Sequence, residues 1–209
     1  MRFQLIDFKS NNITENLDFD DKKLIELNKY PQNYLRFWEV SHYAVILGKS
    51  NSAQKEVNLS NCSTDIPIIK RCSGGGTVLL GPGCLCYSLF IETKKPFHSI
   101  TTTNSNVMSK NCQALKKINP NISVKGFTDL CIGNRKFSGN AQRRMKNITL
   151  FHGTFLYNFD LTQISKTLHH PTKEPDYRIK RKHRDFITNV NMKSSTIKKL
   201  ITDEWINTF

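Results

Sequence analysis

Three consecutive glycines follow an arginine and a serine in the segment Arg71–Gly76. Because glycine has no side chain, a phosphate or carboxylate can approach the backbone N–H groups of such a run directly. Arg71 can add a fixed, two-pronged positive charge. The run lacks the Gly-Lys-Ser/Thr ending of a P-loop and the Gly-x-Gly-x-x-Gly dinucleotide pattern. It predicts an anion-binding loop, with a flexible turn between strands as the alternative.

A lysine suited to stabilising negative charge lies in the segment Arg135–Ala141. If this segment is a strand, its side chains alternate, so Lys136 and Ser138 share one face and Phe137 takes the other. With Phe137 in the core, Lys136 faces a cleft or solvent. A lysine beside an anion loop can stabilise the charge that develops as a carboxylate attacks a phosphate. The alternative is an ordinary surface lysine.

A histidine stands inside an apolar segment, at His152-Gly153-Thr154. A single histidine in a strand is more often packed and hydrogen-bonded than a general base, and both interpretations stay open. Gly153 in mid-strand indicates that a ligand or a neighbouring backbone approaches closely.

Hydrophobic patterning predicts the elements that position these segments. The predicted strands cover residues 3–8, 34–38 and 43–48 (joined by a polar turn), a short buried strand at 66–69, then 85–91, part of 124–132, 135–139 after a turn at 133–134, and 148–158. The predicted helices cover residues 17–27, 101–117 and 188–199, with another near Trp205. Hairpins with helices at the edges predict an α+β fold with a mixed, largely antiparallel sheet and flanking helices. Residues 1–209 are expected to form a single domain.

Composition narrows the classes of partner and compartment. The 209 residues carry a net charge of +14, which favours an anionic substrate or an acidic macromolecule, with nucleic acid as the usual first hypothesis. No apolar stretch approaches the roughly 20 residues of a membrane span, and the N-terminus turns acidic too soon for a signal peptide. The six cysteines form no Cys-x-x-Cys and no histidine completes a zinc set, so no metal site and a reducing, cytoplasmic location are expected.

Several segments in register resemble the catalytic domain of the lipoate-protein ligases, which share a fold with biotin ligases and octanoyltransferases. The family's Arg-x-Ser-Gly-Gly-Gly, Asn-Asp-apolar, Arg-Lys-x-Ser-Gly-x-Ala and His-Gly-Thr-x-Leu motifs correspond to Arg71, Ser73, Gly74, Gly75 and Gly76; to Thr128-Asp129-Leu130, with Thr in place of Asn; to Arg135, Lys136, Ser138, Gly139 and Ala141; and to His152, Gly153, Thr154 and Leu156. The segments Leu35–Trp38 and Val45–Gly48 also fit family strands. The resemblance extends from about Leu17 to about Val190.

The resemblance implies an enzyme that activates lipoate, or octanoate, with ATP and Mg²⁺ to lipoyl-AMP. The lipoyl group would then pass to a lysine of an acceptor lipoyl domain. It also implies that Lys136 contacts both the nucleotide phosphate and the acyl carboxylate, as an electrophilic clamp. The residues implied in ligand binding are Arg71, Ser73, Gly74, Gly75, Gly76, Thr77, Val78, Leu79, Asp129, Lys136, Ser138, Gly139, His152, Gly153 and Thr154. The implied partners are acidic lipoyl domains of dehydrogenase complexes or the glycine-cleavage carrier protein.

The chain departs from the family pattern in two places. Lipoate ligases commonly carry an accessory C-terminal domain or use a separate small subunit, and we expect residues 1–209 to be the catalytic domain alone. Where the family usually reads Ser-Val-Arg-Ser-Arg, this chain has the basic segment Asp176–Asp185. That segment is interpreted as solvated surface, as a docking site for an acidic acceptor, or, less favoured, as a grip on nucleic acid.

Two other enzymes of the same fold are alternatives. An octanoyltransferase would move octanoyl or lipoyl groups between carrier proteins without ATP, and it needs an activated cysteine thiolate near the lysine. Cys131 occupies an apolar strand position and Cys72 lies inside the glycine segment, so neither fits that role well. Biotin ligases have a differently built glycine loop and are disfavoured.

Overall fold

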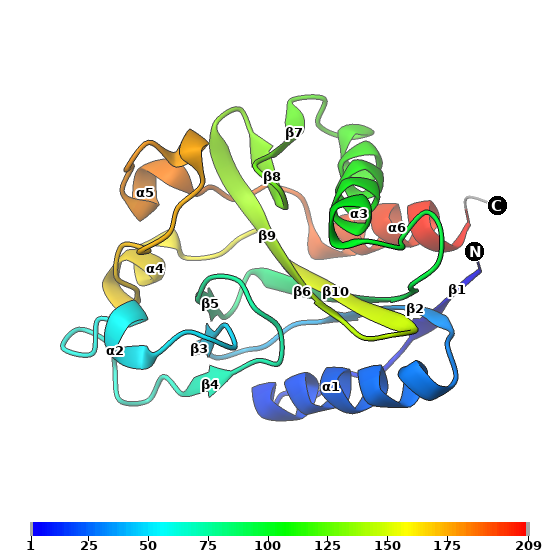
Figure 1. Ribbon diagram of the computed structural model, residues 1–209. Helices are drawn as coiled ribbons and strands as arrows, with labels where there is room; N and C mark the ends of the chain where they lie inside the picture. Colours follow the sequence, from blue (N-terminus) through cyan, green and yellow to red (C-terminus); the bar gives the residue numbers. More distant parts are fainter. Residues whose placement is uncertain (1, 208–209) are drawn as a thin grey trace.

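A seven-stranded sheet runs through the computed structural model, which describes residues 2–207 (Figure 1). Its order is β1 (Phe3–Ile6), β2 (Asn33–Trp38), β6 (Cys84–Glu92), β10 (Ile148–Leu156), β9 (Arg135–Arg144), β8 (Asp129–Ile132) and β7 (Ile122–Lys125). All neighbouring strands are antiparallel except β1 and β2, which are parallel. The predicted α+β class with a mixed, largely antiparallel sheet is confirmed.

A second, three-stranded sheet has the order β4 (Ile68–Lys70), β3 (Ala44–Leu47) and β5 (Val78–Leu80). The strands expected at 34–38 and 43–48 therefore do not form a hairpin, because β2 and β3 belong to different sheets. The expectation of a buried strand at 66–69 is also wrong. β4 pairs only with β3 at the edge of this small sheet, and Ile68 remains exposed.

Three long helices cover the two faces of the large sheet (Figure 1). The helix α1 (Ile13–Lys29) lies on one face, and α3 (Ile100–Lys116) packs with α6 (Ser194–Ile206) on the other. Asn12 caps α1, and a capping box between Ser99 and Thr102 begins α3. The four short helical segments are α2 (Ala53–Glu56), α4 (Leu161–Thr167), η1 (Asp176–Arg178) and α5 (His183–Phe186).

The helix expected at 188–199 begins later, at Ser194, and continues without interruption past Trp205. Residues 188–190 are held in extended form instead, because the N–H of Thr188 donates to the carbonyl of Lys136 and that of Val190 to the carbonyl of Leu156. Backbone pairing with the sheet thus takes precedence over helical patterning.

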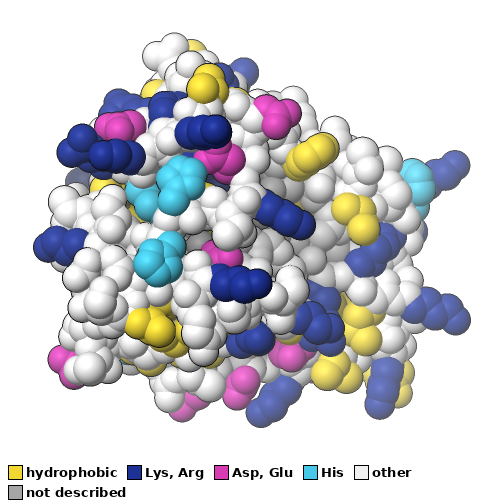
Figure 2. Space-filling view, turned by 60° about the vertical axis from the view of Figure 1, so that its left-hand side comes forward, with side chains coloured by type: hydrophobic (Ala, Val, Ile, Leu, Met, Phe, Trp, Pro, Cys, Tyr) yellow, Lys and Arg dark blue, Asp and Glu magenta, His cyan; other side chains and the backbone are white. Residues whose placement is uncertain are grey.

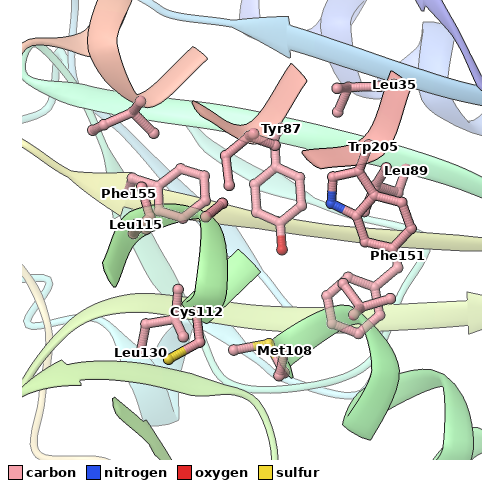
Figure 3. Packing of buried hydrophobic residues seen from close by; sticks show 14 of the residues in the cluster. Leu35, Tyr87, Leu89, Met108, Cys112, Leu115, Leu130, Phe151, Phe155 and Trp205 are labelled. Atoms are coloured by element: carbon pink, nitrogen blue, oxygen red, sulfur yellow. The ribbon is translucent and has the colours of Figure 1, made fainter. Parts of the chain in front are cut away.

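A chain of polar side chains crosses the core between the helices and the sheet. Trp205 Nε1 donates to Asn111 Oδ1 over 2.8 Å, and Asn111 Nδ2 donates to the Tyr87 hydroxyl over 3.0 Å. Tyr87 and Trp205 lie among Leu89, Met108 and Phe151 in this cluster (Figure 3). Buried polar groups need such partners, so these two hydrogen bonds fix α3 and α6 against β6.

A buried arginine on β2 connects the large sheet to α1, on the face opposite α3 and α6. Arg36, on β2, is fully buried; its Nη1 lies 2.8 Å from Asp20 Oδ1, and its Nε donates to the carbonyl of Phe8 over 2.9 Å. Its guanidinium also lies 4.7 Å from the centre of the Phe19 ring. Burying an ion pair is tolerated only when both charges keep good partners, as they do here.

We therefore expect Arg36→Met to lower the free energy of unfolding by about 3–5 kcal/mol, because Asp20 would be left buried without its counter-charge. Urea unfolding followed by circular dichroism measures this change. The control is Lys199→Met, which removes an exposed ion pair with Asp203 and should cost less than about 1 kcal/mol. Equal losses in the two variants would contradict the prediction.

Candidate active site

The glycine segment forms the loop between β4 and β5 and is bound to the end of β3. The N–H of Arg71 donates to the carbonyl of Leu47 over 3.0 Å, and the N–H of Lys49 donates to the carbonyl of Ser73 over 2.8 Å. A side chain at Gly48 would collide with the carbonyl of Gly75, which itself has a φ of +89°. Glycine is thus required at both positions by close approach and by backbone conformation.

The outer side of this loop is open. A side chain added at Gly74 or Gly76 would meet no described atom within 4 Å. Packing within the described chain therefore does not explain the absence of side chains there. The open backbone fits the predicted approach of an anion.

Arg71 holds the loop from inside. Its Nε donates to Ser73 Oγ over 2.9 Å, its Nη1 to the carbonyl of Ile46 over 3.3 Å, and its Nη2 to the carbonyls of Gly74 and Gly76 over 2.6 and 2.8 Å. The side chain is buried, and desolvation lowers its pKa to about 10. The expectation of a two-pronged fork presented to an anion is wrong in this structure, because Nη2 donates both hydrogens to the loop carbonyls of Gly74 and Gly76 and Nη1 donates to the strand carbonyl of Ile46.

His152 joins the loop to the large sheet. Its Nε2 lies 2.6 Å from Ser73 Oγ, and Ser73 is buried. Desolvation, followed by the charge of Arg71, lowers the pKa of His152 to about 3, so the ring is neutral at physiological pH. Of the two interpretations, the packed, hydrogen-bonded histidine agrees with this geometry.

Lys136 lies on β9 beside a β-bulge. The register with β8 passes from the pair Leu130–Ser138 to the pair Cys131–Lys136, so Phe137 is an extra residue on β9. Phe137 is buried in the core, as alternation predicts, whereas the Lys136 side chain is 29% exposed. Bulges commonly redirect a side chain beside an active site.

An acidic residue fixes the lysine ammonium. Lys136 Nζ lies 2.7 Å from Asp129 Oδ1, and a Cβ added at Gly139 would lie 2.8 Å from both Cε and Nζ of the lysine. The lysine side chain therefore passes directly over Gly139, where any larger residue would collide with it.

Asn140 is a site residue that the sequence interpretation missed. Its Oδ1 accepts a hydrogen bond from the Tyr87 hydroxyl over 2.6 Å, and its Nδ2 donates to the carbonyl of Thr128 over 2.7 Å. A side chain at Gly153 would collide with Asn140, so the mid-strand glycine signalled this approach without identifying the neighbour. Asn140 connects the site to the polar chain through the core.

Two cavities meet at Lys136. The inner cavity, of about 150 Å³, has apolar walls that include Leu17, Trp38, Ile46 and Leu80. The outer cavity, of about 370 Å³, is bordered by Asp129, Ser138, His169, Lys173 and Arg178. The residues that line both cavities are Gly76, Thr77, Val78, Lys136, Gly139, Asn140 and Thr154.

The structure brings the predicted site residues together around these cavities. Arg71, His152 and Gly153 line the inner cavity, while Leu79, Asp129 and Ser138 line the outer one. Gly75 borders the outer cavity and, with Gly74, an adjoining groove beside α3. Ser73, within the loop, is buried and lines neither cavity.

The cysteines near the site are not activated. Cys131 is buried and Cys72 is partly buried, and in each case desolvation is the largest effect and raises the pKa of the thiol. A thiol with a raised pKa carries little thiolate at neutral pH. All six cysteines of the chain are described and all are free.

The basic segment is only partly solvent-facing. Arg178 is buried and its Nε donates to the carbonyl of Arg181 over 3.0 Å, whereas Arg181 donates to four backbone carbonyls. Lys180, Lys182 and Arg184 are exposed. Figure 2 shows Lys, Arg and His side chains gathered on one face of the molecule. The interpretation of the whole segment as solvated surface is therefore wrong for the buried Arg178 and the half-buried Arg181.

Comparison with known proteins identifies the family. The profile described as the lipoyl protein ligase A/B catalytic domain matches residues 12–206. The chain belongs to this family. Membership confirms the resemblance stated from the sequence motifs.

Relatives and solved structures of this family agree with that assignment. The chain is 30% identical to lipoate–protein ligase 1 of Staphylococcus aureus, over 76% of this chain and 48% of that protein. It is 32% identical to lipoate-protein ligase A of Blochmanniella floridana, over 68% of this chain and 42% of that protein, so it spans less than half the length of these relatives.

No helix within residues 2–207 has the length and apolar character to cross a membrane.

The fold matches solved lipoyl ligases over nearly the whole chain. The bipartite lipoate protein ligase of Thermoplasma acidophilum, solved in a study of that ligase and its E2 lipoyl domain, aligns with a TM-score of 0.84 at 21% identity, over 98% of this chain and 82% of that chain. A lipoate-protein ligase A bound with ATP aligns with a TM-score of 0.82 at 21% identity, over 98% of this chain and 84% of that chain.

The low pKa of His152 predicts a pH-dependent contribution to stability. In the unfolded chain His152 becomes protonated below its usual pKa of 6.5, whereas in the native protein it stays neutral down to about pH 3. The contribution is therefore complete above pH 6.5 and is lost as the pH falls from 6.5 to about 3, by about 1.4 kcal/mol per pH unit. In His152→Gln this part of the pH dependence should disappear, as measured by urea unfolding between pH 7 and pH 4. Parallel pH curves for the variant and the wild type would contradict the assignment.

Proposed function

We propose that this chain catalyses ATP-dependent lipoylation: it activates lipoate, or octanoate, as an acyl-adenylate and transfers the acyl group to a lysine of an acceptor protein. The observation that carries the proposal is the meeting of two cavities, of about 150 and 370 Å³, at one lysine ammonium. The inner cavity has apolar walls that suit an acyl chain, and the larger outer cavity adds the charged groups of Lys173 and Arg178, which suit a nucleotide. The reacting anions of both substrates would meet at Lys136.

The first step joins two anions, so it needs a positive charge between them. A carboxylate oxygen of the acid attacks the α-phosphorus of ATP. The bond from that phosphorus to the oxygen bridging the α- and β-phosphates breaks, and pyrophosphate leaves. Lys136 Nζ would stabilise the negative charge on the α-phosphate oxygens and hold the carboxylate in line. The open N–H groups at Gly74 and Gly76 would offer further donors.

In this proposal each cavity binds one substrate. The acyl chain lies in the inner cavity, along Leu17, Trp38, Ile46 and Leu80. The nucleotide lies in the outer cavity, between the loop Gly76–Leu79 and the basic segment. The ATP-bound ligase that shares this fold supports the choice of nucleotide.

Mg²⁺ would arrive with ATP as part of the substrate. Asp129 and Glu56 are the carboxylates that border the outer cavity. Among residues 2–207 no group of three or more His, Cys, Asp or Glu side chains is placed to hold a metal ion. Both oxygens of Asp129 already have partners, Lys136 and Tyr177. Magnesium bound to nucleotide phosphates needs only one or two carboxylates, so Glu56 is the residue that fits that mode of binding.

In the second step an acceptor lysine amine attacks the acyl carbonyl and AMP leaves. Acidic lipoyl domains, of dehydrogenase complexes or a glycine-cleavage carrier, are the proposed acceptors, because the net charge of +14 attracts them. The E2 lipoyl domain named with the Thermoplasma ligase supports this choice. A catalytic unit spanning residues 1–209, an accessory subunit acting with it, and a reducing, cytoplasmic setting complete the proposal; the six free cysteines are compatible with that setting.

Lipoate-dependent release of pyrophosphate from ATP should fall by at least about a hundredfold in Lys136→Ala, because a hydrogen-bonding charge aimed at the transition state is removed. A coupled pyrophosphate assay measures this rate. Lys166→Ala, which removes an exposed lysine on α4, is the matched control and should retain the wild-type rate. Full activity of Lys136→Ala would overturn the assignment of this lysine.

Acyl transfer should need ATP and no cysteine nucleophile. Mass spectrometry of an acceptor lipoyl domain, after incubation with lipoate, should detect the lipoyl adduct only when ATP is present. The variants Cys72→Ser and Cys131→Ser should retain this activity, because the raised thiol pKa values argue against acyl-thioester chemistry. ATP-independent transfer from an octanoylated carrier, abolished in either variant, would instead establish an octanoyltransferase.

A further inference from the structure

Tyr177, in the segment η1, reaches the acid that holds the active-site lysine. Its hydroxyl donates to Asp129 Oδ2 over 2.7 Å, while Asp129 Oδ1 lies 2.7 Å from Lys136 Nζ. One carboxylate thus has each oxygen occupied by a different partner. A carboxylate bound on both oxygens cannot rotate about its Cβ–Cγ bond without breaking a contact, so the tyrosine fixes the point to which the ammonium is bound.

The basic segment fixes this tyrosine. Arg181 Nη2 donates to the carbonyl of Tyr177 over 2.9 Å and to that of Asn134, in the turn before β9, over 3.0 Å. The Tyr177 ring packs on Phe186 with 5.3 Å between ring centres. Two of the three arginines of this segment, Arg178 and Arg181, lie 4.6 and 5.3 Å from the centre of that same phenylalanine ring.

The chain between these anchors makes an unusual turn. Ile179 and Lys180 both have positive φ angles, 52° and 54°, which non-glycine residues seldom adopt. The N–H of Lys180 donates to Glu174 Oε1 over 2.8 Å, and Glu174 Oε2 lies 3.4 Å from Arg178 Nε. A strained turn held from both sides is a costly arrangement, and such strain collects at functional sites.

The phenol acts as a donor throughout the working pH range. Desolvation first, and then the negative charge of Asp129, raise the pKa of Tyr177 well above its usual value. The Cys131 thiol, 3.5 Å away, points a weak donor at the same hydroxyl oxygen, which leaves the phenol proton for Asp129.

We infer that Tyr177 is a positioning residue that sets the direction of the Lys136 ammonium through Asp129, and that Arg181 and Phe186 hold this tyrosine in place. The inference rests on the proposed adenylation. It assigns to the two internal arginines an architectural role: they fold the segment over the outer cavity so that the tyrosine hydroxyl meets the carboxylate.

Tyr177→Phe tests this role, because it removes only the hydroxyl. The kcat of lipoate-dependent pyrophosphate release should fall about ten- to hundredfold, as expected when a hydrogen bond to a charged group is lost. The KM values for ATP and lipoate and the melting temperature should stay close to those of the wild type. The matched control is Tyr30→Phe, which removes an exposed hydroxyl at the end of α1 and should change none of these values. An unchanged kcat in Tyr177→Phe, or a rise in KM alone, would overturn the inference.

A double-mutant cycle with Asp129→Asn separates positioning from general structure. If Tyr177 acts through Asp129, the Asp129→Asn/Tyr177→Phe variant should be no slower than Asp129→Asn alone. Multiplying losses would show that Tyr177 acts by another route and would contradict the inference. Wild-type protein that releases no pyrophosphate with lipoate would refute the proposed function itself, which is a different result from either outcome of the cycle.

Discussion

The ion pair between Lys136 and Asp129 is the contact on which the rest of the site depends. Lys136 Nζ and Asp129 Oδ1 lie 2.7 Å apart, at the place where the inner and outer cavities meet. The bulge at Phe137 and the absent side chain of Gly139 give the lysine its course. An ammonium held in advance does not have to be reoriented as charge develops, which is how a fixed charge accelerates a reaction between anions.

Although the net charge of the chain is +14, several of its arginines hold the backbone in place instead of presenting their charge to a ligand. Arg36, Arg71 and Arg178 are all buried, and each donates hydrogen bonds to backbone carbonyls. Their planar guanidinium groups bind several carbonyls at once, so they fix irregular backbone that no regular pairing would hold. Lys136, with its single point of charge, lines both cavities.

Local signals made the long elements and the site predictable, whereas contacts between distant segments were not. The helices α1 and α3 and the strands β6 and β10 follow from periodicity, and the glycine loop, Lys136 and His152 from residue type and spacing. The separation of β2 from β3 into different sheets depends on which strand each one pairs with, and periodicity does not encode pairing. Asn140 and Tyr177 were missed because their side-chain partners, Tyr87 and Asp129, are distant from them in the sequence. Arg71 was assigned to the right loop, but its donors proved to face the loop's own carbonyls.

The segment Gly76–Val78 ties the two cavities together, since it forms part of the wall of both. Its position depends on Arg71 Nη2, which binds the carbonyl of Gly76, and on the Thr77 hydroxyl, which accepts a hydrogen bond from Asn51 Nδ2 over 3.0 Å. A ligand that moves this wall in one cavity must change the shape of the other, because packed backbone transmits small displacements. The same loop that offers open N–H groups to an anion therefore also forms a wall shared by both cavities, at the place where Lys136 lies.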